Sequence, residues 1–421
     1  MAKVFPRHLV RFGSEALGAF PALVIQGARQ VGKSTLAAML TDGPGARLFT
    51  LDDEATLAAA KADSRAFVDQ VAKGTMVIDE VQRHPALMLA IKASIDRDRR
   101  PGRFVLTGSS DLLRLPSTPD SLAGRAATLR LRGLSQGELA DAEPEDFVAA
   151  ALSGGRPELH TSSLSRAEYA ARIARGAFPE LQTLTGRLHT TWLDSYLERV
   201  IRRDSVDLPG GGQPERSRAV IRLIAANQAG ELVKARLAQQ AGVPAQSITT
   251  YLDALATVFL TETLPPWTPN LTRREIGRHK AMVADSALAM RLSRVSREQI
   301  SALIGGEMLG GLLEGFVITE MLKQRDWSEH GYQLFHFRDR NGWEVDLVIE
   351  LDDGRVIGIE VKASSTFRAE HFAGLVALRD RLGDRFAAGF VLGTAEAAFQ
   401  YAERLWGMPV AALWEWRPKA N

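Results

Sequence analysis

Residues 27–35 read Gly-Ala-Arg-Gln-Val-Gly-Lys-Ser-Thr, and this stretch decides the fold of the first part of the chain. It fits G-x-x-x-x-G-K-[ST], the Walker A phosphate loop. The apolar run Leu23–Ile25 before it predicts a buried strand, and Leu36–Leu40 after it predicts the first turns of a helix. In such a loop, backbone N–H groups close around phosphates at a helix N-terminus, where the helix dipole adds to the attraction. The order strand, loop, helix therefore predicts a nucleotide site, with a glycine-rich turn that holds no ligand as the alternative.

The chemistry of this loop assigns roles to single residues. Lys33 would reach the β- and γ-phosphates of ATP, and Ser34 would hold Mg²⁺. The loop residues expected to contact the nucleotide are Gly27, Gln30, Val31, Gly32, Lys33, Ser34 and Thr35. The sequence thus predicts ATP and Mg²⁺ as ligands.

Two further strands are predicted to end in carboxylates. Thr75–Ile78 is followed by Asp79 and Glu80, the pattern of a Walker B motif, in which Asp79 would hold Mg²⁺ through water and Glu80 would polarise the attacking water. Alone, this pair could equally cap a loop, but the phosphate loop upstream favours the catalytic interpretation. Arg47–Leu51 predicts another strand, and Asp52–Glu54 after it could cap the next helix.

A fourth strand, Phe104–Ser110, ends in small hydroxyl residues. In the P-loop branch that inserts an extra strand between the two Walker strands, a polar residue at this place senses the γ-phosphate. Ser109 or Ser110 is the candidate sensor. Arg125 follows the core strands and could stabilise transition-state charge, in the same subunit or in a neighbouring one. An ordinary surface or salt-bridged arginine is an equally good interpretation of Arg125.

Taken together, these stretches resemble the prokaryotic AAA-type ATPases that carry a C-terminal module known as DUF4143. In order, the stretches are 27–35, 51–53, 77–82, 106–110 and 122–125. The resemblance continues at 175–180 and at 192–204, the latter with Tyr196, Arg203 and Asp204. It departs at 131–135, where the family usually has a proline before the Leu-Ser pair, which puts a local turn in doubt. The resemblance implies an ATPase that uses ATP and Mg²⁺.

Length and composition set the outer bounds. At 421 residues the chain is too long for one core, and its net charge of +2 does not by itself indicate a nucleic-acid binder, although the pI of about 8.9 permits a basic patch. The absence of cysteine excludes disulfides and zinc–thiolate sites. No signal-type segment or membrane-length apolar run is present, so we expect a soluble cytoplasmic protein without a membrane partner.

Four regions are predicted along the chain. They are a P-loop AAA-type ATPase domain at 1–141, a helical connector at 142–208, a winged-helix-like domain at 209–300 and a nuclease-like domain at 301–421, with a flexible break at 209–214. The fold class is thus α/β, with a P-loop parallel sheet followed by a helical and winged-helix region and a restriction-endonuclease-like domain.

The third region shows a helix-turn-helix pattern. Helices are expected at 218–227, 233–240 and 245–259, followed by a hairpin at 260–267. If the module reads DNA, its third helix would present Gln246, Ser247, Thr249 and Thr250 to a groove. That helix contains no Arg or Lys between residues 245 and 259, and phosphate contacts supply most non-specific affinity. A packing or interaction role is therefore favoured over DNA reading.

The last region carries a second group of charged residues. Glu344–Glu350 is predicted to form a half-buried strand, 352–355 a turn and Val356–Lys362 the returning strand. Glu360 and Lys362 lie on one side of that strand, and Asp346 can approach them from its partner.

Asp346 followed by Glu360-x-Lys362 resembles the PD-(D/E)XK core of Holliday junction resolvases and many restriction enzymes. The resemblance implies that Asp346 and Glu360 hold Mg²⁺ and that Lys362 positions or activates water for phosphodiester attack. The preceding helix, 312–324, would add a further metal ligand, with Glu314 preferred over Glu320. A salt-bridged strand pair that cleaves nothing is the alternative.

Three hypotheses follow for the whole chain. The first is an ATP-hydrolysing AAA-type motor or switch that acts on DNA through its C-terminal half. The second is a metal-dependent DNA nuclease that ATP gates, and the third is a nucleotide-switched interaction protein that processes no substrate. The catalytic candidates are Lys33, Glu80, Arg125, Asp346, Glu360 and Lys362; the expected partners are ATP or ADP, DNA and, because of Arg125, further copies of the chain.

Overall fold

The computed structural model describes residues 3–417 except 44, 112–121, 205–212, 270–273, 275–276 and 303–305. The chain forms two compact units: residues 1–134 with 178–180 and 257–259 make the first, and the remainder makes the second. The second unit contains most of the residues that we assigned from the sequence to a helical connector, a winged-helix-like domain and a nuclease-like domain. Most of the break expected at 209–214 lies outside the described residues.

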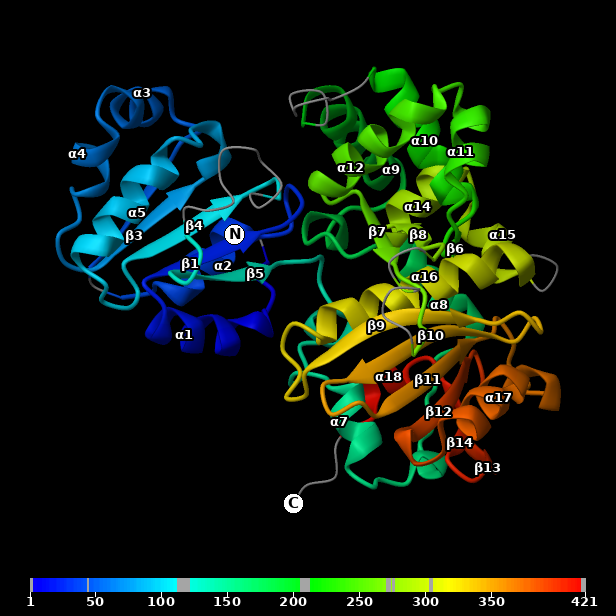
Figure 1. The fold of residues 1–421 in the computed structure, drawn as a ribbon. Coiled ribbons are helices and arrows are strands. Elements are labelled where there is room, and N and C mark those ends of the chain that lie inside the picture. Colours follow the sequence, from blue (N-terminus) through cyan, green and yellow to red (C-terminus); the bar gives the residue numbers. More distant parts are fainter. Residues whose placement is uncertain are drawn as a thin grey trace. The chain divides into compact units, whose positions relative to one another are not determined.

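The first unit is built on a five-stranded parallel sheet (Figure 1). Its strands are β1 Ala22–Gln26, β2 Ala46–Thr50, β3 Thr75–Asp79, β4 Phe104–Gly108 and β5 Ala126–Arg130, in the order β2-β3-β4-β1-β5. The sheet carries α1 Leu9–Ala19, α2 Lys33–Leu40, α3 Glu54–Ala62, α4 Ser64–Val68 and α5 Leu87–Arg97. Strand β4 lies between β1 and β3, which confirms the expected extra strand between the two Walker strands.

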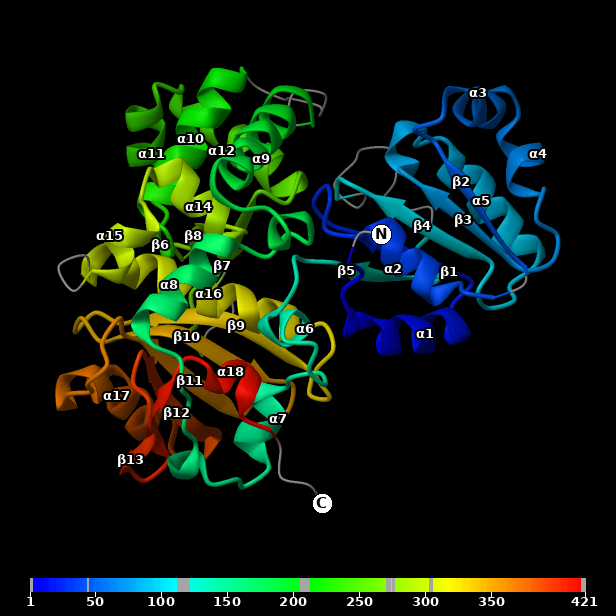
Figure 2. The same ribbon diagram turned by 180° about the vertical axis from the view of Figure 1, so that it is seen from behind.

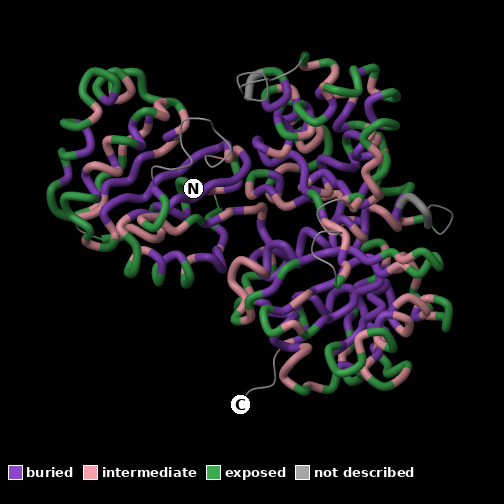
Figure 3. Tube along the Cα trace, viewed as in Figure 1, coloured by how far each residue is buried: buried purple, intermediate pink, exposed green. Residues whose placement is uncertain are grey.

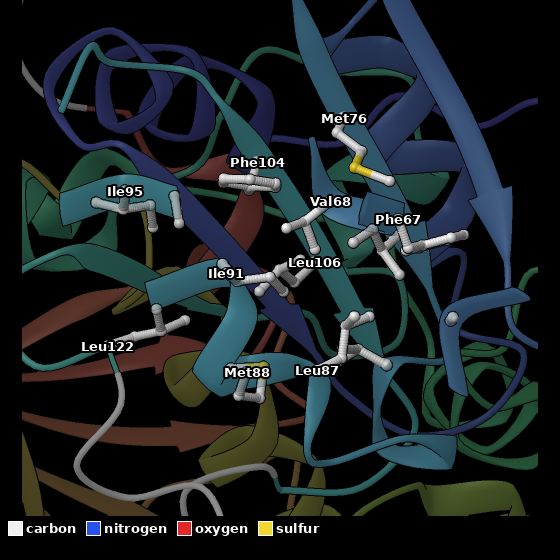
Figure 4. Packing of buried hydrophobic residues seen from close by; sticks show 14 of the residues in the cluster. Phe67, Val68, Met76, Leu87, Met88, Ile91, Ile95, Phe104, Leu106 and Leu122 are labelled. Carbon is white, nitrogen blue, oxygen red and sulfur yellow. The ribbon is translucent and has the colours of Figure 1, made fainter. Parts of the chain in front are cut away.

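One face of this sheet packs on an apolar core (Figure 4). Leu87, Ile91 and Ile95 recur every four residues along α5, so they share the face of the helix that meets Phe104 and Leu106 of β4. All five side chains are buried. Strands β1 and β4 are buried along their whole length (Figure 3), whereas the edge strand β2 is only partly buried. The buried strands β1 and β4 thus hold in place the loops that follow their carboxyl ends.

The second unit holds two sheets (Figures 1 and 2). The six-stranded sheet has the order β13-β14-β12-β11-β10-β9, with β9 Tyr332–Arg338, β10 Glu344–Leu351, β11 Val356–Val361, β12 Phe386–Gly393, β13 Phe399–Ala402 and β14 Leu405–Pro409. The three-stranded sheet has the order β6-β8-β7, with β6 Gly230–Glu231, β7 Thr261–Leu264 and β8 Lys280–Val283.

Helices surround both sheets. They are α6 Gln136–Leu139, α7 Phe147–Leu152, α8 Arg166–Arg175, α9 Gly186–Arg199, α10 Pro214–Ala226, α11 Lys234–Ala241, α12 Ile248–Thr257, α14 Ser286–Ser293, α15 Arg297–Ser301, α16 Gly306–Gln324, α17 Ala373–Leu382 and α18 Ala412–Glu415. Helices α10, α11 and α12 lie where three helices were expected, although the third starts with a 3₁₀ turn at Ala245–Ser247. Within the described part of the chain, no helix is both long and apolar enough to cross a bilayer.

The expectation that Glu344–Glu350 forms a half-buried strand was wrong. All of β11 and most of β10 are buried. Helix α17 covers the face that carries Gly358, where an added Cβ would lie 2.6 Å from a Leu375 methyl carbon, and α16 also contacts β11. Asp346 and Glu360 are therefore buried, whereas Glu344 and Glu350 are partly exposed.

Candidate nucleotide site

The loop from β1 to α2 has the backbone that its glycines permit. The N–H of Gly27 donates to the carbonyl of Gly108 at the end of β4 (3.3 Å), and a Cβ on Gly27 would overlap the carbonyl oxygen of Leu131. Gly32 has φ 97°, a left-handed conformation that strains residues with a side chain, and Gln30 has φ 62°. These features shape a closed loop at the N-terminus of α2.

Two groups suited to a hard cation meet beside this loop. The hydroxyl of Ser34, in the first turn of α2, donates to Oδ2 of Asp79 at 3.1 Å, and Asp79 ends β3. Both offer oxygen atoms, which Mg²⁺ prefers. Lys33 is buried, and its ammonium donates to the carbonyl of Ala28 within the loop (3.0 Å). Thr35 is exposed on α2. The residues therefore fit a magnesium–phosphate ligand.

Glu80 and Ser109 meet at the ends of neighbouring strands. The hydroxyl of Ser109 donates to Oε2 of Glu80 at 2.8 Å, and the amide of Gln82 donates to Ser109 Oγ at 2.9 Å and to the same Glu80 oxygen. Glu80 has φ 58°, unusual for a residue with a side chain. Of the two candidate sensors, Ser109 makes the contact with the carboxylate, and Ser110 is buried beside it.

Three residues in the site were not predicted from the sequence. Thr107 donates its hydroxyl to Asp79 Oδ1 and accepts the N–H of Glu80 at 3.4 Å. Gln82 bridges Glu80 and Ser109, as described above. Arg7 donates to the carbonyl of Val31 in the phosphate loop at 2.7 Å. A threonine inside an otherwise apolar strand was a usable signal for Thr107, but nothing near Arg7 in the sequence points to the loop.

Arg125 lies in an ion pair. Its Nε and Nη2 donate to the two carboxylate oxygens of Asp96 on α5, at 2.7 and 3.1 Å. The hydrogen bond to Asp96 raises the pKa of Arg125. The structure thus places Arg125 in the salt-bridged arrangement, one of the two interpretations that the sequence left open.

In the second unit, the strand pair brings the nuclease-like residues together. The N–H of Val361 donates to Asp346 Oδ2 at 2.9 Å, the N–H of Asp346 donates to Glu360 Oε2 at 3.3 Å, and Lys362 Nζ lies 2.5 Å from Glu360 Oε1. A register shift between Val345 and Val348 in β10 accompanies this arrangement. Burial and the charge of Asp346 raise the pKa of Glu360 to about 8.

The two helix candidates lie at different places. Glu314 is connected to Asp346 through Lys280, a residue that the sequence did not single out: Lys280 Nζ lies 2.6 Å from Glu314 and 3.2 Å from Asp346. Glu320 is fully buried elsewhere, where it accepts the N–H of Gln136 at 2.9 Å and pairs with Lys323. Glu314 is therefore the helix carboxylate that belongs to this group.

Comparison with known families agrees with the parallel sheet and the phosphate loop. Residues 19–140 match the family described as an AAA domain. The match supports an AAA-type P-loop ATPase domain in this part of the chain. Residues 309–413 match the domain of unknown function DUF4143, as expected, and residues 166–299 match another domain of unknown function, DUF8612.

Proteins similar to this chain include two uncharacterised proteins, from Mycobacterium bovis and Mycobacterium tuberculosis. Each is 29% identical over 354 residues, which is 83% of this chain and 72% of the relative. Among solved structures, a Walker-type ATPase of Pyrococcus abyssi is 14% identical with a TM-score of 0.40, covering 69% of this chain and 96% of its own. RuvB of Thermotoga maritima is 17% identical with a TM-score of 0.30, covering 65% and 89%. Similarity at this level supports no inference about function.

Proposed function

We propose that the protein hydrolyses ATP in a Mg²⁺-dependent reaction at the ends of β1, β3 and β4. The observation that supports this proposal is the convergence of two pairs: Ser34 with Asp79, and Glu80 with Ser109. In sequence the members of each pair lie 45 and 29 residues apart, so only the strand order β3-β4-β1 brings them to one edge of the sheet.

Each residue has a distinct role in this proposal. Lys33 and the loop N–H groups bind the β- and γ-phosphates, Ser34 and Asp79 hold the ion, and Glu80 orients and polarises the attacking water. The ion, when bound, neutralises charge that develops on the phosphate oxygens. Ser109 holds the Glu80 carboxylate and senses the γ-phosphate. Arg125 would stabilise transition-state charge only after leaving Asp96.

The second part of the proposal is that the ATPase acts on DNA through its C-terminal half. A cleft of about 940 Å³ between α9, α10 and α14 is lined by four arginines, Arg218, Arg222, Arg291 and Arg294, against two carboxylates, Asp194 and Glu198. The carboxylates pair with Arg291 and Arg218, whereas Arg222 and Arg294 form no ion pair with any described residue. This cationic surplus suits a phosphate backbone.

The test is the ATP hydrolysis rate with and without duplex, single-stranded and branched DNA, with the same DNA run on a gel. We expect hydrolysis to rise with DNA, the DNA to remain uncut, and Arg222→Ala/Arg294→Ala to abolish the rise while leaving the basal rate unchanged. Arg355→Ala/Arg368→Ala removes the same charge from exposed positions elsewhere and should change neither.

Two results would redirect the proposal. An ATP hydrolysis rate that no DNA changes would favour a nucleotide-switched interaction protein that processes no substrate. Mg²⁺-dependent cuts that vanish in Glu360→Ala would instead establish the ATP-gated nuclease. Light scattering with and without ATP tests the proposed assembly into oligomers, and a monomer in both conditions would contradict it.

A further inference from the structure

Lys280 places its ammonium among the carboxylates of the nuclease-like site. Nζ lies 2.6 Å from Glu314 Oε1, 3.2 Å from Glu344 Oε1 and 3.2 Å from Asp346 Oδ1. Only 4% of the Lys280 side chain is exposed. An ammonium has three N–H donors, and here each has one carboxylate within hydrogen-bonding reach. The donor capacity of Lys280 is thus fully used inside this cluster.

The backbone holds this ammonium in place. Lys280 begins β8, the central strand of its sheet, where it pairs with Glu231 of β6 on one side and with Leu264 of β7 on the other. The next residue toward the N-terminus, His279, accepts the N–H of Leu232 at 2.7 Å. Both neighbouring strands thus fix the backbone of Lys280, and its Cα stays beside the carboxylates.

The helix that carries Glu314 is held equally closely. A Cβ on Gly315 of α16 would lie 2.7 Å from the amide nitrogen of Gln228, and this amide bonds the backbone of Val283 in β8 at 3.0 and 3.1 Å. The small residue beside Glu314 therefore lets α16 approach the strand that carries Lys280. The contact of Gly315 with Gln228 thus accounts for the short distance between Glu314 and Lys280.

The cluster does not fit a divalent metal. Mg²⁺ binds oxygen at about 2.0–2.1 Å, with its ligands gathered around one point. With the Lys280 ammonium between them, no three His, Cys, Asp or Glu side chains in the described part of the chain lie close enough together to hold a metal ion. The point that the carboxylates of Glu314, Glu344 and Asp346 share is the position of an ammonium, and a metal there would have to displace it.

We propose that Lys280 supplies the cation of this site in place of a divalent metal, so that the nuclease-like strand pair is a metal-independent ion cluster. The cluster joins β8 of one sheet to β10 of the other and to α16. The C-terminal half then binds its partner without cutting it. This inference stands independently of ATP hydrolysis in the first unit.

The charges agree with this assignment. Four carboxylates, Glu314, Glu344, Asp346 and Glu360, face the two ammonium groups of Lys280 and Lys362. Burial and the charge of Asp346 raise the pKa of Glu314 to about 8, as they do for Glu360. Against the effect of burial, Asp346 and Glu314 raise the pKa of Lys280, which therefore stays charged. The raised pKa values of Glu314 and Glu360 favour their uncharged forms, which reduces the excess of negative charge.

Mn²⁺ binding to the full chain without nucleotide tests the proposal, with free Mn²⁺ counted by electron paramagnetic resonance. Every protein carries Asp79→Asn, which removes the aspartate ligand of the first unit. We expect no bound Mn²⁺ in this background at millimolar metal, one bound Mn²⁺ after adding Lys280→Ala, and loss of that ion after adding Glu314→Gln. Mn²⁺ should also raise the unfolding temperature of the Lys280→Ala protein but not of its parent.

Two results would overturn the proposal. One is Mn²⁺ binding by the parent that Asp346→Asn abolishes, since a metal would then bind with Lys280 in place. The other is a folded Lys280→Ala protein that binds no Mn²⁺. Lys280→Met keeps most of the side-chain volume if Lys280→Ala does not fold, and the comparison of the parent with Asp346→Asn decides the question without any change at Lys280.

Discussion

The buried carboxylates of the ion cluster predict an unusual pH dependence of stability. The pKa of Glu360 is raised from 4.5 to about 8 in the folded state. Between these two pH values, the folded protein therefore holds a proton that the unfolded chain has released. The stabilising contribution of this group is complete below the unfolded pKa and is lost as pH rises through about 8. The unfolding free energy should therefore fall with rising pH in this window.

The slope gives the magnitude. One retained proton lowers the unfolding free energy by about 1.4 kcal/mol per pH unit, or about 3 kcal/mol between about pH 5.5 and about pH 7.5. Burial lowers the pKa of His160 and of His336, and these residues contribute the opposite slope near pH 6. The comparison with Glu360→Gln, which keeps the uncharged form at every pH, isolates the contribution of Glu360.

Urea unfolding followed by tryptophan fluorescence provides the assay. All seven tryptophans lie in the second unit, so the signal reports the unit that contains the cluster. We expect Glu360→Gln to reduce the fall in stability with pH, and Glu314, whose pKa is also raised to about 8, to account for the part that remains. Glu403→Gln, at a side chain that is 86% exposed, should leave the wild-type slope unchanged. Equal slopes in wild type and Glu360→Gln would refute the reasoning.

Three predictions concern the first unit. Gly27→Ala forces a Cβ onto a backbone oxygen, so it should lower calorimetric stability by about 1–3 kcal/mol and abolish binding of a fluorescent ATP analogue; Gly18→Ala, which meets nothing within 4 Å, should do neither. Thr107→Val removes the hydroxyl that orients the Walker B aspartate, and it should weaken Mg²⁺–ATP binding about 10- to 100-fold in a titration, whereas unchanged affinity would show that this hydrogen bond is dispensable. Arg125→Ala should slow ATP hydrolysis without changing ATP affinity, whereas Asp96→Asn, which removes the charge of the partner, should not slow hydrolysis. Equal hydrolysis rates in the two variants would show that Arg125 acts only through its ion pair with Asp96.

Local patterns in the sequence were sufficient for most of the first unit. The phosphate loop, the acidic strand end and the hydroxyl-ended strand each occupy a short run of residues, and parallel strands bring their carboxyl ends to one edge. The position of β4 between the two Walker strands was expected, whereas the places of β2 and β5 in the sheet were not predicted. Thr107 and Arg7 were missed because their roles depend on which strand or loop lies next to them, and no short motif encodes that.

The second unit shows where sequence reasoning stops. The Asp346 and Glu360-x-Lys362 spacing indicated the hairpin, but it could not show that β11 is buried along its whole length. Lys280 belongs to a different sheet and lies 66 residues before Asp346, so it had no motif to connect it with the carboxylates. Only tertiary packing brings Lys280, the residue that we propose excludes a metal, to this site.

The central claim is that ATP is hydrolysed where Ser34, Asp79, Glu80 and Ser109 meet. The most direct measurement is the single-turnover hydrolysis of ATP by wild type, Lys33→Ala and Glu80→Gln, with nucleotide binding measured on the same samples. We predict that wild type hydrolyses ATP only with Mg²⁺, that Glu80→Gln binds ATP and retains it unhydrolysed, and that Lys33→Ala fails to bind. Hydrolysis at the wild-type rate by Glu80→Gln would contradict the account.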